Sequence, residues 1–412
     1  MKILILGSGG REHAIGKKLL QDNPFIELYF YPGNGGTNKI GKNLETNYSI
    51  SELYFFSKKN AIDLTIVGSE NFLLDGIVDI FKNGGLTIMG AHYQSSRLEG
   101  DRMFAKSFMK KYGVRTPQYK VFTSYQKAIN FLKKTTYSVA IKTNGIAEGK
   151  GVFLVKNKQE AEQALNYIFI DKKFGKSGNK VIIEEFLKGN ESSIISIYNS
   201  KEIIPFLSAK DYKKIGEKET GSNTGGMGSI SPNPYMKNDI WIDFKKNILE
   251  PTLEGLFLEK LTFFGFIYFG LMITSTNKVY LLEYNTRMGD PETQTLLPLM
   301  KSNFLHIIQS TFMKKDIVIA WKSLCSCCVV ISSKGYPEKY ENGKIIKGLN
   351  YLKEPFYIAG AKKEKEEWIT SRGRVLNIVG LGKSIEEARK KAYQKVQKVY
   401  FENCYFRKDI GL

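Results

Sequence analysis

With 412 residues, 42 % of them hydrophobic, the chain is long enough for two to four domains and has the composition of an ordinary globular protein. The longest apolar run, LTFFGFIYFGLMI, is interrupted by glycines and too short to span a bilayer, and no basic leader precedes the first strand. We therefore expect a cytoplasmic protein without a membrane partner. The formal net charge is +20, but the lysines are spread through helices and turns, which disfavours a nucleic-acid partner and favours anionic small molecules.

The first part of the chain, to about residue 99, alternates strand and helix patterns and predicts a parallel sheet covered on both faces. The strand KILILG leads into Gly7-Ser8-Gly9-Gly10 and a helix from Arg11. Glu12 replaces the third glycine of a dinucleotide fingerprint, and the next strand ends in Tyr31-Pro32-Gly33 without an acidic residue. A nicotinamide site is therefore not predicted, but the helix N-terminus still suits an anion.

The next segment, to about Leu187, reads as a compact α/β unit after one helix over LEGDRMFAKSFMKKYG. In VAIKTNGIAEGKGVFLV, Lys142 ends a strand, and a loop with Gly145, Gly149 and Gly151 leads into the next strand. The spacing is not that of a Walker A loop. Such a loop can lay backbone amides over phosphates while lysines supply charge. An ordinary glycine-rich hairpin is the alternative.

The stretch IEEFLKGNESSI has the pattern of a strand and turn that can form an adenosine pocket. Backbone groups of the strand Glu184-Glu185-Phe186-Leu187 would bond the base edge, and Glu191 would reach the ribose hydroxyls. A plain edge strand and turn is the alternative. Two antiparallel strands follow, ESSIISIY and KEIIPFL, and then a long loop from Lys210 to Pro234. Its part TGSNTGGMGSISP has the composition of a mobile lid over phosphates, or of a disordered surface loop.

The strand and turn KVYLLEYNTRMGDPETQ predict a magnesium site. Because alternate strand residues share a face, Glu283, Asn285 and Arg287 are expected on one face, and Leu282 and Tyr284 on the other. A carboxylate and an amide oxygen suit a magnesium ion whose coordination shell also contains phosphate oxygens. The arginine can neutralise a phosphate or an oxyanion. A strand with one solvated polar face is the alternative, but the following GDPE crowds more carboxylates onto the same end.

The last ninety or so residues read as a small α+β unit that closes with the helix SIEEARKKAYQKVQKVYF. Three of the four cysteines, Cys325, Cys327 and Cys328, lie in the apolar run CSCCVVIS, and the fourth is Cys404. With only three histidines in the chain, a zinc site is not predicted, and we interpret the cysteines as structural.

The order of these parts resembles the ATP-grasp ligases. The motifs GSGGREHA, PGNGGT, DLTIVGSE, LEGDRMFAK, IEEFLKGNE, TGSNTGGMGSISP, EYNTRMGDPETQ and RGRVLNIVGLG together resemble the phosphoribosylamine–glycine ligase family over essentially the whole chain. The resemblance implies a mixed α/β and α+β fold with a parallel-sheet N-terminal domain (1–99), an ATP-grasp domain (100–318) with a lid subdomain at about 117–187, and a C-terminal α+β domain (319–412). It also implies ligation of glycine to 5-phosphoribosylamine, with ATP consumed and glycyl phosphate as intermediate.

The resemblance further implies a role for particular residues. ATP would be bound by Arg102, Lys142, Gly149, Lys150, Gly151, Glu184, Glu185, Phe186, Leu187 and Glu191. Magnesium, or manganese, would be held by Glu283 and Asn285. Catalysis would depend on Arg287, Asp290 and Lys142, and the other substrates would be bound by Gly9, Gly10, Gly33, Asn34, Asp211 and Asp290, with Asp211, Asp290 and Glu292 as alternatives for the glycine ammonium group.

Some positions depart from the family pattern. Asp101-Arg102 stands where Ser-Lys is typical, so an arginine replaces a phosphate lysine, and Asn144 stands where Asp is typical. The strand IYFGLMI carries no carboxylate, which leaves the number of bound metal ions open. The alternatives are another ATP-grasp carboxylate–amine ligase of purine metabolism or a non-catalytic ATP-binding relative. We expect a monomer.

Overall fold

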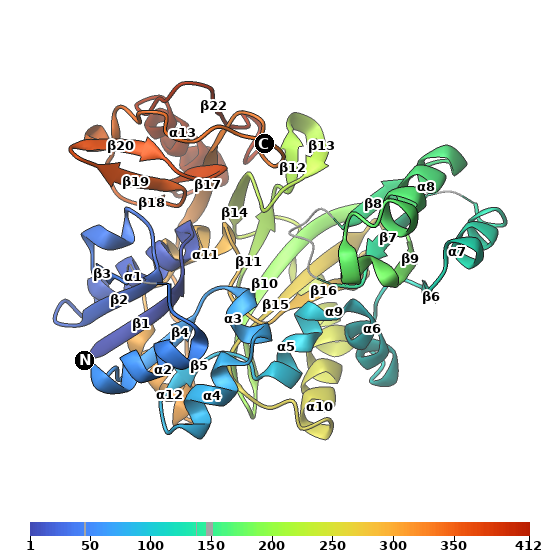
Figure 1. The fold of residues 1–412 in the computed structure, drawn as a ribbon, viewed down its shortest axis with the longest axis horizontal. Helices are drawn as coiled ribbons and strands as arrows, with labels where there is room; N and C mark the ends of the chain where they lie inside the picture. The colour runs from blue at the N-terminus through green and yellow to red at the C-terminus, as the bar shows by residue number, and fades with distance from the viewer. Residues whose placement is uncertain (45–46, 137, 146–150) are drawn as a thin grey trace.

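The structure, a computed structural model, describes residues 1–44, 47–136, 138–145 and 151–412. In these ranges the chain forms a five-stranded, a nine-stranded and a four-stranded sheet with two small hairpins (Figure 1). No helix among the described residues is long and apolar enough to cross a membrane. The mixed α/β and α+β fold expected from the sequence is confirmed, whereas the bounds of its domains stay a prediction.

The N-terminal sheet is entirely parallel, in the order β3-β2-β1-β4-β5. Alternate residues of β1 pack into two hydrophobic cores on opposite faces of the sheet. Ile3 and Ile5 pack with α1 and α12, while Leu4 and Leu6 pack with α2 and α4. This two-sided burial explains the short apolar strands of the sequence. The elements are β1 Lys2–Gly7, α1 Gly10–Asp22, β2 Glu27–Pro32, β3 Lys42–Asn43, α2 Ile50–Lys59, β4 Leu64–Val67, α3 Glu70–Leu74, α4 Ile77–Asn83, β5 Ile88–Met89 and α5 Tyr93–Gly100.

The single helix expected from Leu98 is in fact two helices. Helix α5 ends at Gly100, and α6 (Arg102–Lys111) begins after Asp101, whose side chain accepts a hydrogen bond from Phe104 N at 3.0 Å. An aspartate at this position satisfies a backbone N–H group that the first turn leaves free, so it begins a new helix instead of continuing the old one.

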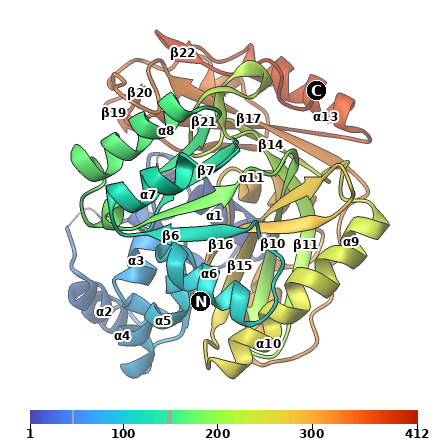
Figure 2. The same cartoon turned by 90° about the vertical axis from the view of Figure 1, so that its right-hand side faces the viewer.

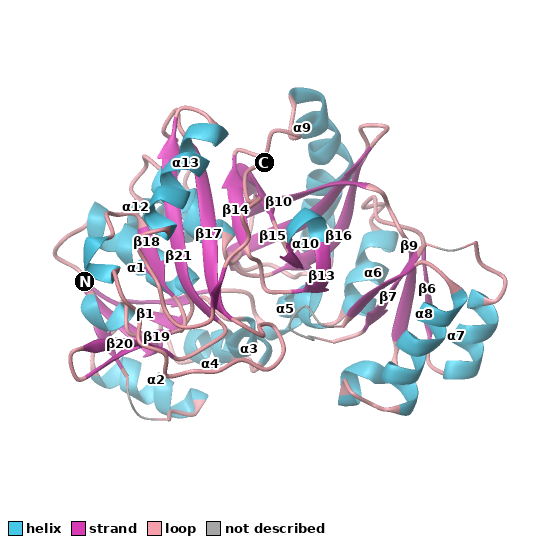
Figure 3. Ribbon diagram, turned by 90° about the horizontal axis from the view of Figure 1, so that it is seen from above, coloured by secondary structure: helices cyan, strands magenta, loops and turns pink. Residues whose placement is uncertain are grey.

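A separate four-stranded antiparallel sheet, in the order β6-β9-β7-β8, follows α6. Figures 2 and 3 show α7 and α8 lying over this sheet, which projects away from the nine-stranded sheet. The helices pack on it through apolar side chains such as Ile129, Leu132, Ile141 and Leu165. The elements are β6 Tyr119–Phe122, α7 Tyr125–Leu132, β7 Val139–Thr143, β8 Val152–Val155, α8 Lys158–Leu165 and β9 Val181–Glu185.

The large antiparallel sheet has the order β16-β15-β10-β11-β14-β17-β21-β18, with β22 beside β17. It runs across the boundary expected near residue 318, so the C-terminal strands extend the sheet that carries the site. Its strands are β10 Gly189–Asn199, β11 Ile203–Asp211, β14 Gly228–Ser231, β15 Phe264–Thr274, β16 Val279–Asn285, β17 Cys325–Ser333, β18 Phe356–Ile358, β21 Arg374–Gly382 and β22 Cys404–Tyr405. The remaining elements are the hairpins β12 Lys214–Gly216 with β13 Thr220–Asn223 and β19 Ala361–Glu364 with β20 Glu367–Thr370, and the helices α9 Asn238–Phe244, α10 Glu250–Leu258, α11 Glu292–Leu296, α12 Phe304–Phe312 and α13 Ile385–Val396.

The expectation of one long loop between Lys210 and Pro234 is wrong. This stretch forms the hairpin β12–β13 and then β14, all of whose residues are buried between β11 and β17. Glycine and serine have weak strand propensity, so local residue preferences do not predict β14. Its partner Cys325–Ser333 lies about a hundred residues further along the chain, and pairing with it fixes the strand.

Candidate active site

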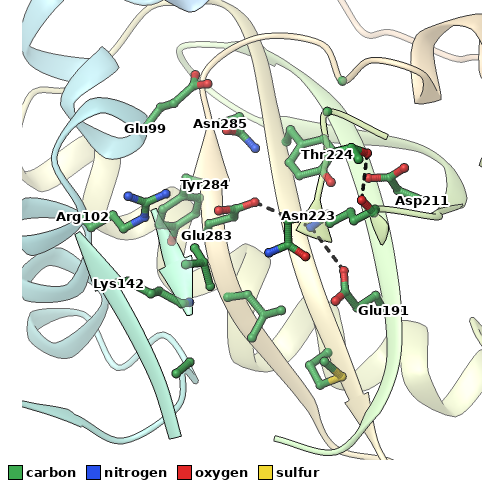
Figure 4. Close-up of a pocket in the computed structure, with 18 of the residues that line it drawn as sticks. Glu99, Arg102, Lys142, Glu191, Asp211, Asn223, Thr224, Glu283, Tyr284 and Asn285 are labelled. Atoms are coloured by element: carbon green, nitrogen blue, oxygen red, sulfur yellow. Dashed lines mark hydrogen bonds and ion pairs between the residues drawn. The ribbon is translucent and has the colours of Figure 1, made fainter. Parts of the chain in front are cut away.

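A cavity of about 610 Å³ opens between the nine-stranded sheet, the four-stranded sheet and the N-terminal helices. Its walls come from α5, α6, β7, β9, β11 and β16, together with the segment after β17 (Figure 4). Twelve of the residues singled out in the sequence lie in these walls: Arg102, Lys142, Glu184, Glu185, Phe186, Leu187, Glu191, Asp211, Glu283, Asn285, Arg287 and Asp290. The structure therefore brings most of the predicted site residues together around one cavity, whereas their roles stay a prediction.

Two buried lysines flank Glu184 at the end of the cavity formed by the four-stranded sheet. Glu184 is 2 % exposed and lies 2.9 Å from Lys106 Nζ and 2.8 Å from Lys142 Nζ. Burial alone would raise the pKa of Glu184, but Lys142 and Lys106 outweigh it and lower the pKa. Burial lowers the pKa of Lys106 to about 8 against the opposing charge of Glu184. The sequence interpretation missed Lys106, although it lies four residues after Arg102 on the same helix face.

The base of the cavity is formed by β16, where Glu283 and Asn285 both face the interior (Figure 4). The expectation that Leu282 points the other way is wrong, because it also lines the cavity. A bulge in the pairing of β15 with β16, between Gly270 and Leu271, shifts the alternation at this point. Tyr284 also borders the cavity, but its side chain is buried and its hydroxyl lies in the core, 2.6 Å from Thr252 Oγ1.

Glu283 and Asn285 have the chemistry of a magnesium site. A carboxylate and an amide offer the hard oxygen atoms that magnesium prefers, and two protein ligands suit an ion that keeps phosphate and water in its shell. Among the described residues, no group of three or more histidine, cysteine, aspartate or glutamate side chains could hold a metal.

Lys213 connects the carboxylates on both sides of this base. Its Nζ lies 3.2 Å from Glu191 Oε2 and 3.8 Å from Glu283 Oε1. Although burial by itself lowers a lysine pKa, the carboxylates, Glu191 foremost, hold the pKa of Lys213 well above its usual range. The sequence interpretation missed this residue, because nothing local marks a lysine at the end of β11 as central to a cavity.

A pair of buried carboxylates lies beside Lys213. Burial and then the neighbouring Glu292 raise the pKa of Asp211 well above its usual range. Asp211 Oδ1 is buried without a hydrogen-bond partner among the described residues. Glu292 accepts a hydrogen bond of 2.9 Å from Ser193 Oγ, which lies 2.8 Å from the hydroxyl of Tyr268. Such a pair, one member lacking a donor, suits a cationic ligand group.

Arg287 is held by two carboxylates from the N-terminal helices. Its Nε lies 3.1 Å from Glu70 Oε2, and Nη2 lies 2.9 Å from Glu99 Oε1. Glu99 also accepts a hydrogen bond of 2.8 Å from Thr286 N. Both carboxylates lie in motifs quoted from the sequence, but the sequence did not predict their contact with Arg287, which lies about two hundred residues away. The N-terminal helices thus orient a guanidinium group that belongs to the base of the cavity.

The Glu70–Arg287 pair predicts a change in acid stability. Arg287 lowers the pKa of Glu70 to about 2, so the pair stabilises the fold fully above pH 4.5 and loses this effect as the pH falls towards 2. Between pH 5 and pH 3 the parent should therefore lose about 2 kcal/mol more unfolding free energy than Glu70→Gln. Urea unfolding of both proteins at the two pH values measures this difference. Glu254→Gln, an exposed glutamate of α10, is the control and should match the parent. Equal acid losses in Glu70→Gln and parent would contradict the assignment.

Asp290 is already paired in the structure. It lies 3.3 Å from Arg374 Nη1 and accepts a hydrogen bond of 2.7 Å from Gln294 Nε2. Burial would raise its pKa, but Arg374 and further positive neighbours lower it. Arg374 also donates to Asp290 O at 2.8 Å and to Gly225 O. The C-terminal strand β21 thus fixes the turn that carries Asp290.

The glycine-rich turns of the N-terminal sheet lie behind the cavity wall. None of Gly9, Gly10, Gly33 and Asn34 is among the residues that line the cavity. The amide of Asn34 donates to the backbone oxygens of Ser8 (3.0 Å), Gly9 (3.1 Å) and Ile358 (3.0 Å), so it ties the turn to β18. Gly9 lies nearest to the site: a Cβ atom there would be 3.0 Å from Asp290 Oδ2. Their role in substrate binding stays a prediction.

The strand expected to hold adenosine offers only part of its backbone. Glu185 N donates to Gln118 O at 3.0 Å and Phe186 N donates to Ser138 O at 3.2 Å, so neither N–H group is open to a base. The apolar side chains of Leu187, Met272 and others line the cavity and can cover a base. Gly151 O accepts from Thr143 N at 2.9 Å, and the predicted ligands Gly149 and Lys150 lie outside the described residues.

A parallel N-terminal sheet, a four-stranded antiparallel sheet with buried lysines and a carboxylate–amide pair on a second sheet define an ATP-grasp ligase. The sequence profiles of the phosphoribosylglycinamide synthetase N domain, ATP-grasp (A) domain and C domain match residues 1–99, 100–293 and 326–412. The chain belongs to the phosphoribosylamine–glycine ligase family, as the resemblance implied.

Individual relatives agree with this assignment. The chain is 50 % identical over 420 residues to a phosphoribosylamine–glycine ligase of Fusobacterium nucleatum, covering 100 % of this chain and 98 % of the relative. It is 47 % identical over 414 residues to that of Clostridium acetobutylicum, covering 100 % and 99 %. The crystal structure of the Thermotoga maritima phosphoribosylamine–glycine ligase superposes with a TM-score of 0.87 at 33 % identity, covering 100 % of both chains. A biotin carboxylase domain of Hydrogenobacter thermophilus shares the fold alone, with a TM-score of 0.76 at 11 % identity over 98 % of this chain and 91 % of that one.

Proposed function

We propose that this chain ligates glycine to 5-phosphoribosylamine and converts ATP to ADP and phosphate. The observation that carries the proposal is one cavity in which lysines, a magnesium-type oxygen pair and the Asp211 carboxylate face one another, and Asp211 Oδ1 is buried with no hydrogen-bond partner among the described residues. These are the groups needed to bind ATP, align a phosphoryl transfer and hold an amino acid by its ammonium group. The names of the relatives supply the identity of the acid and the amine.

Glu283 and Asn285 would hold magnesium, or manganese, at the base of the cavity. When bound there, the ion would neutralise charge on the phosphates of ATP and lower the barrier to phosphoryl transfer. Lys142 and Arg102 would bind phosphate oxygens at the opposite wall, and Glu191 the ribose. Leu187 and the apolar lining would cover adenine. This division of roles leaves Lys213 between the nucleotide and the amino acid.

The chemistry would proceed through glycyl phosphate. A carboxylate oxygen of glycine attacks the γ-phosphorus of ATP, the bond from this phosphorus to the β–γ bridging oxygen breaks, and ADP leaves. The amine nitrogen of 5-phosphoribosylamine then attacks the carbonyl carbon, phosphate leaves, and the nitrogen loses a proton. Arg287, held by Glu70 and Glu99, lies where a guanidinium can stabilise the acyl phosphate and the tetrahedral oxyanion. Such a mechanism depends on positioning and charge rather than on a nucleophilic side chain.

Asp211 is the carboxylate that best suits the glycine ammonium group. Its Oδ1 has no hydrogen-bond donor in the described parts of the chain, whereas Asp290 is already bound by Arg374 and Gln294. Asp211→Asn should therefore raise the KM for glycine by about a hundredfold and leave the KM for ATP within about threefold, because only the ammonium loses its counter-charge. Steady-state kinetics with each substrate varied measures both constants. Asp290→Asn is the comparison: a larger glycine effect in that variant would transfer the role to Asp290.

The proposal is tested by ADP release from the purified protein with magnesium-ATP and freshly generated phosphoribosylamine, with and without glycine. We expect release only when glycine is present, and little when alanine replaces it. Release that is indifferent to glycine would mean that another acid is activated, as in a different ATP-grasp ligase. ATP binding without turnover would indicate a non-catalytic relative.

We further propose that the enzyme works in the cytoplasm as a monomer on small molecules, without nucleic acid or membrane partners. The spread of its lysines along the chain supports this, because nucleic-acid sites gather them on one face. The division into domains at 1–99, 100–318 and 319–412, with 117–187 moving as a lid, is part of the same proposal. Salt-sensitive binding of the protein to double- or single-stranded nucleic acid would contradict the part of this proposal that excludes a nucleic-acid partner.

A further inference from the structure

The first residue of α6 is tied to the end of β7 by its side chain. Arg102 Nη1 donates two hydrogen bonds, each of 2.7 Å, to Thr143 O and Gly145 O. Both carbonyl groups belong to the turn that directly follows Lys142 in the chain. One guanidinium nitrogen thus bridges the two sides of this turn with its two N–H groups. This nitrogen lies one bond further from the backbone than the ammonium nitrogen of a lysine would.

The backbone of α6 holds the residue between those two carbonyl groups. Arg102 N donates to Asn144 O at 3.0 Å, and Met103 N donates to Asn144 Oδ1 at 2.8 Å. Asp101 caps the same helix end through Phe104 N. The first N–H groups of α6 are therefore satisfied by Asn144 and by the cap, so Asn144, in the turn after β7, serves as a second helix-capping group.

The turn is also held from its other side. Asn144 N donates to Ser177 O at 3.0 Å, and a Cβ atom at Gly145 would lie 2.2 Å from Ser177 Oγ. Thr143 itself is fully buried. The three residues Thr143–Gly145 are thus packed between α6 and the segment before β9, at the edge of the cavity that Lys142 and Arg102 line.

We propose that Arg102 and Asn144 act as one clamp that fixes the turn Thr143–Gly145, and with it Lys142, at the nucleotide end of the cavity. Arg102 is then a positioning residue in addition to being a positive charge in the cavity wall. The backbones of the two residues meet, since Arg102 N donates to Asn144 O, and their side chains hold the same turn through different groups, so we treat the pair as one unit. The part of the proposal that concerns nucleotide rests on the proposed function, whereas the clamp itself does not.

Hydrogen exchange of the nucleotide-free protein tests the clamp directly. Arg102→Lys keeps the charge, but its nitrogen lies one bond nearer the backbone and falls short of the two carbonyl groups, and Asn144→Ala removes the acceptor for Met103 N. We expect the Asn144 amide to exchange about five- to tenfold faster in Arg102→Lys, and the Met103 amide likewise in Asn144→Ala. The matched control is Arg97→Lys: Arg97 pairs with Asp101 at 3.4 Å outside the cavity, and its variant should exchange like the parent. Parental exchange in Arg102→Lys would overturn the clamp.

Binding of magnesium-ADP, measured by calorimetry, tests what the clamp does. Each single variant should raise the Kd about five- to tenfold, and Arg102→Lys with Asn144→Ala together should raise it no further than the larger single effect, because both hold one turn. Effects that multiply would mean two independent residues and overturn the shared unit. If the parent binds no magnesium-ADP while exchange still reports the clamp, the positioning role and the proposed function fail but the contact stands. Kd values of all variants equal to that of a binding parent would overturn the positioning role alone.

Discussion

Glu283→Ala is expected to lower glycine-dependent ADP release by about a thousandfold or more, the largest effect of any single change in the cavity. Glu283 is the only carboxylate of the predicted magnesium pair, and an amide oxygen alone holds this ion poorly. Its loss also leaves Lys213 paired with Glu191 only, at 3.2 Å. Adenosine should bind as it does to the parent, because its predicted contacts lie on β9 and β10. Turnover assays and adenosine titration measure the two effects.

A metal readout makes this prediction specific. Manganese binding in the presence of ADP should be lost in Glu283→Ala and partly retained in Glu283→Asp, which keeps the carboxylate at shorter reach. Glu254→Ala on the exposed face of α10 should keep both binding and turnover. Ligation near the parental rate in Glu283→Ala would contradict the assignment of Glu283 as a metal ligand. Retained manganese binding with lost turnover would show that Glu283 has a different role in the reaction.

The parts of the fold that the sequence predicted well are those fixed by local patterning. The run KILILG became β1 because its alternate residues, such as Ile3 and Leu4, are buried against helices on opposite faces. The short β-branched strands of the four-stranded sheet were also located for this reason. Periodicity needs no knowledge of distant partners, so it can be read from the chain alone.

What the sequence could not predict depends on partners far along the chain. The glycine- and serine-rich β14 became a strand because Gly228 and Ile230 pair with Val329 and Cys327. Leu282 faces the cavity because β16 forms a bulge in its pairing with β15, and no residue of β16 predicts that bulge.

The candidate site divides in the same way. Glu283 and Asn285 were predictable, since two residues at a spacing of two on a strand share a face. Lys106, Lys213 and Glu70 were not, because their importance comes from charges that folding brings to them. A buried charge that needs a partner is a property of the assembled cavity rather than of a motif.

Glu184→Ala is expected to destabilise the protein by about 3–5 kcal/mol, the largest stability effect in the cavity. Glu184 is 2 % exposed and neutralises two lysines, Lys106 and Lys142, which are only 3 % and 8 % exposed. Without the carboxylate, two ammonium groups remain in a desolvated site, and at least one must lose its proton or draw water into the core. Urea unfolding followed by a probe in the four-stranded sheet measures the loss.

The neighbouring residue and a second substitution separate charge from packing. Glu185 is exposed and accepts one hydrogen bond, of 2.9 Å from Gln118 N, so Glu185→Ala should cost less than about 1 kcal/mol. Adding Lys106→Met to Glu184→Ala should recover part of the loss, because the second change removes one of the two stranded charges and keeps a similar volume. Recovery would establish that the cost of losing Glu184 is mainly the burial of unpaired lysines. If the losses of unfolding free energy from Glu184→Ala and Lys106→Met simply add, the cost would instead come from the packing of β9. The positions of Lys106 and Lys142 would then not depend on Glu184.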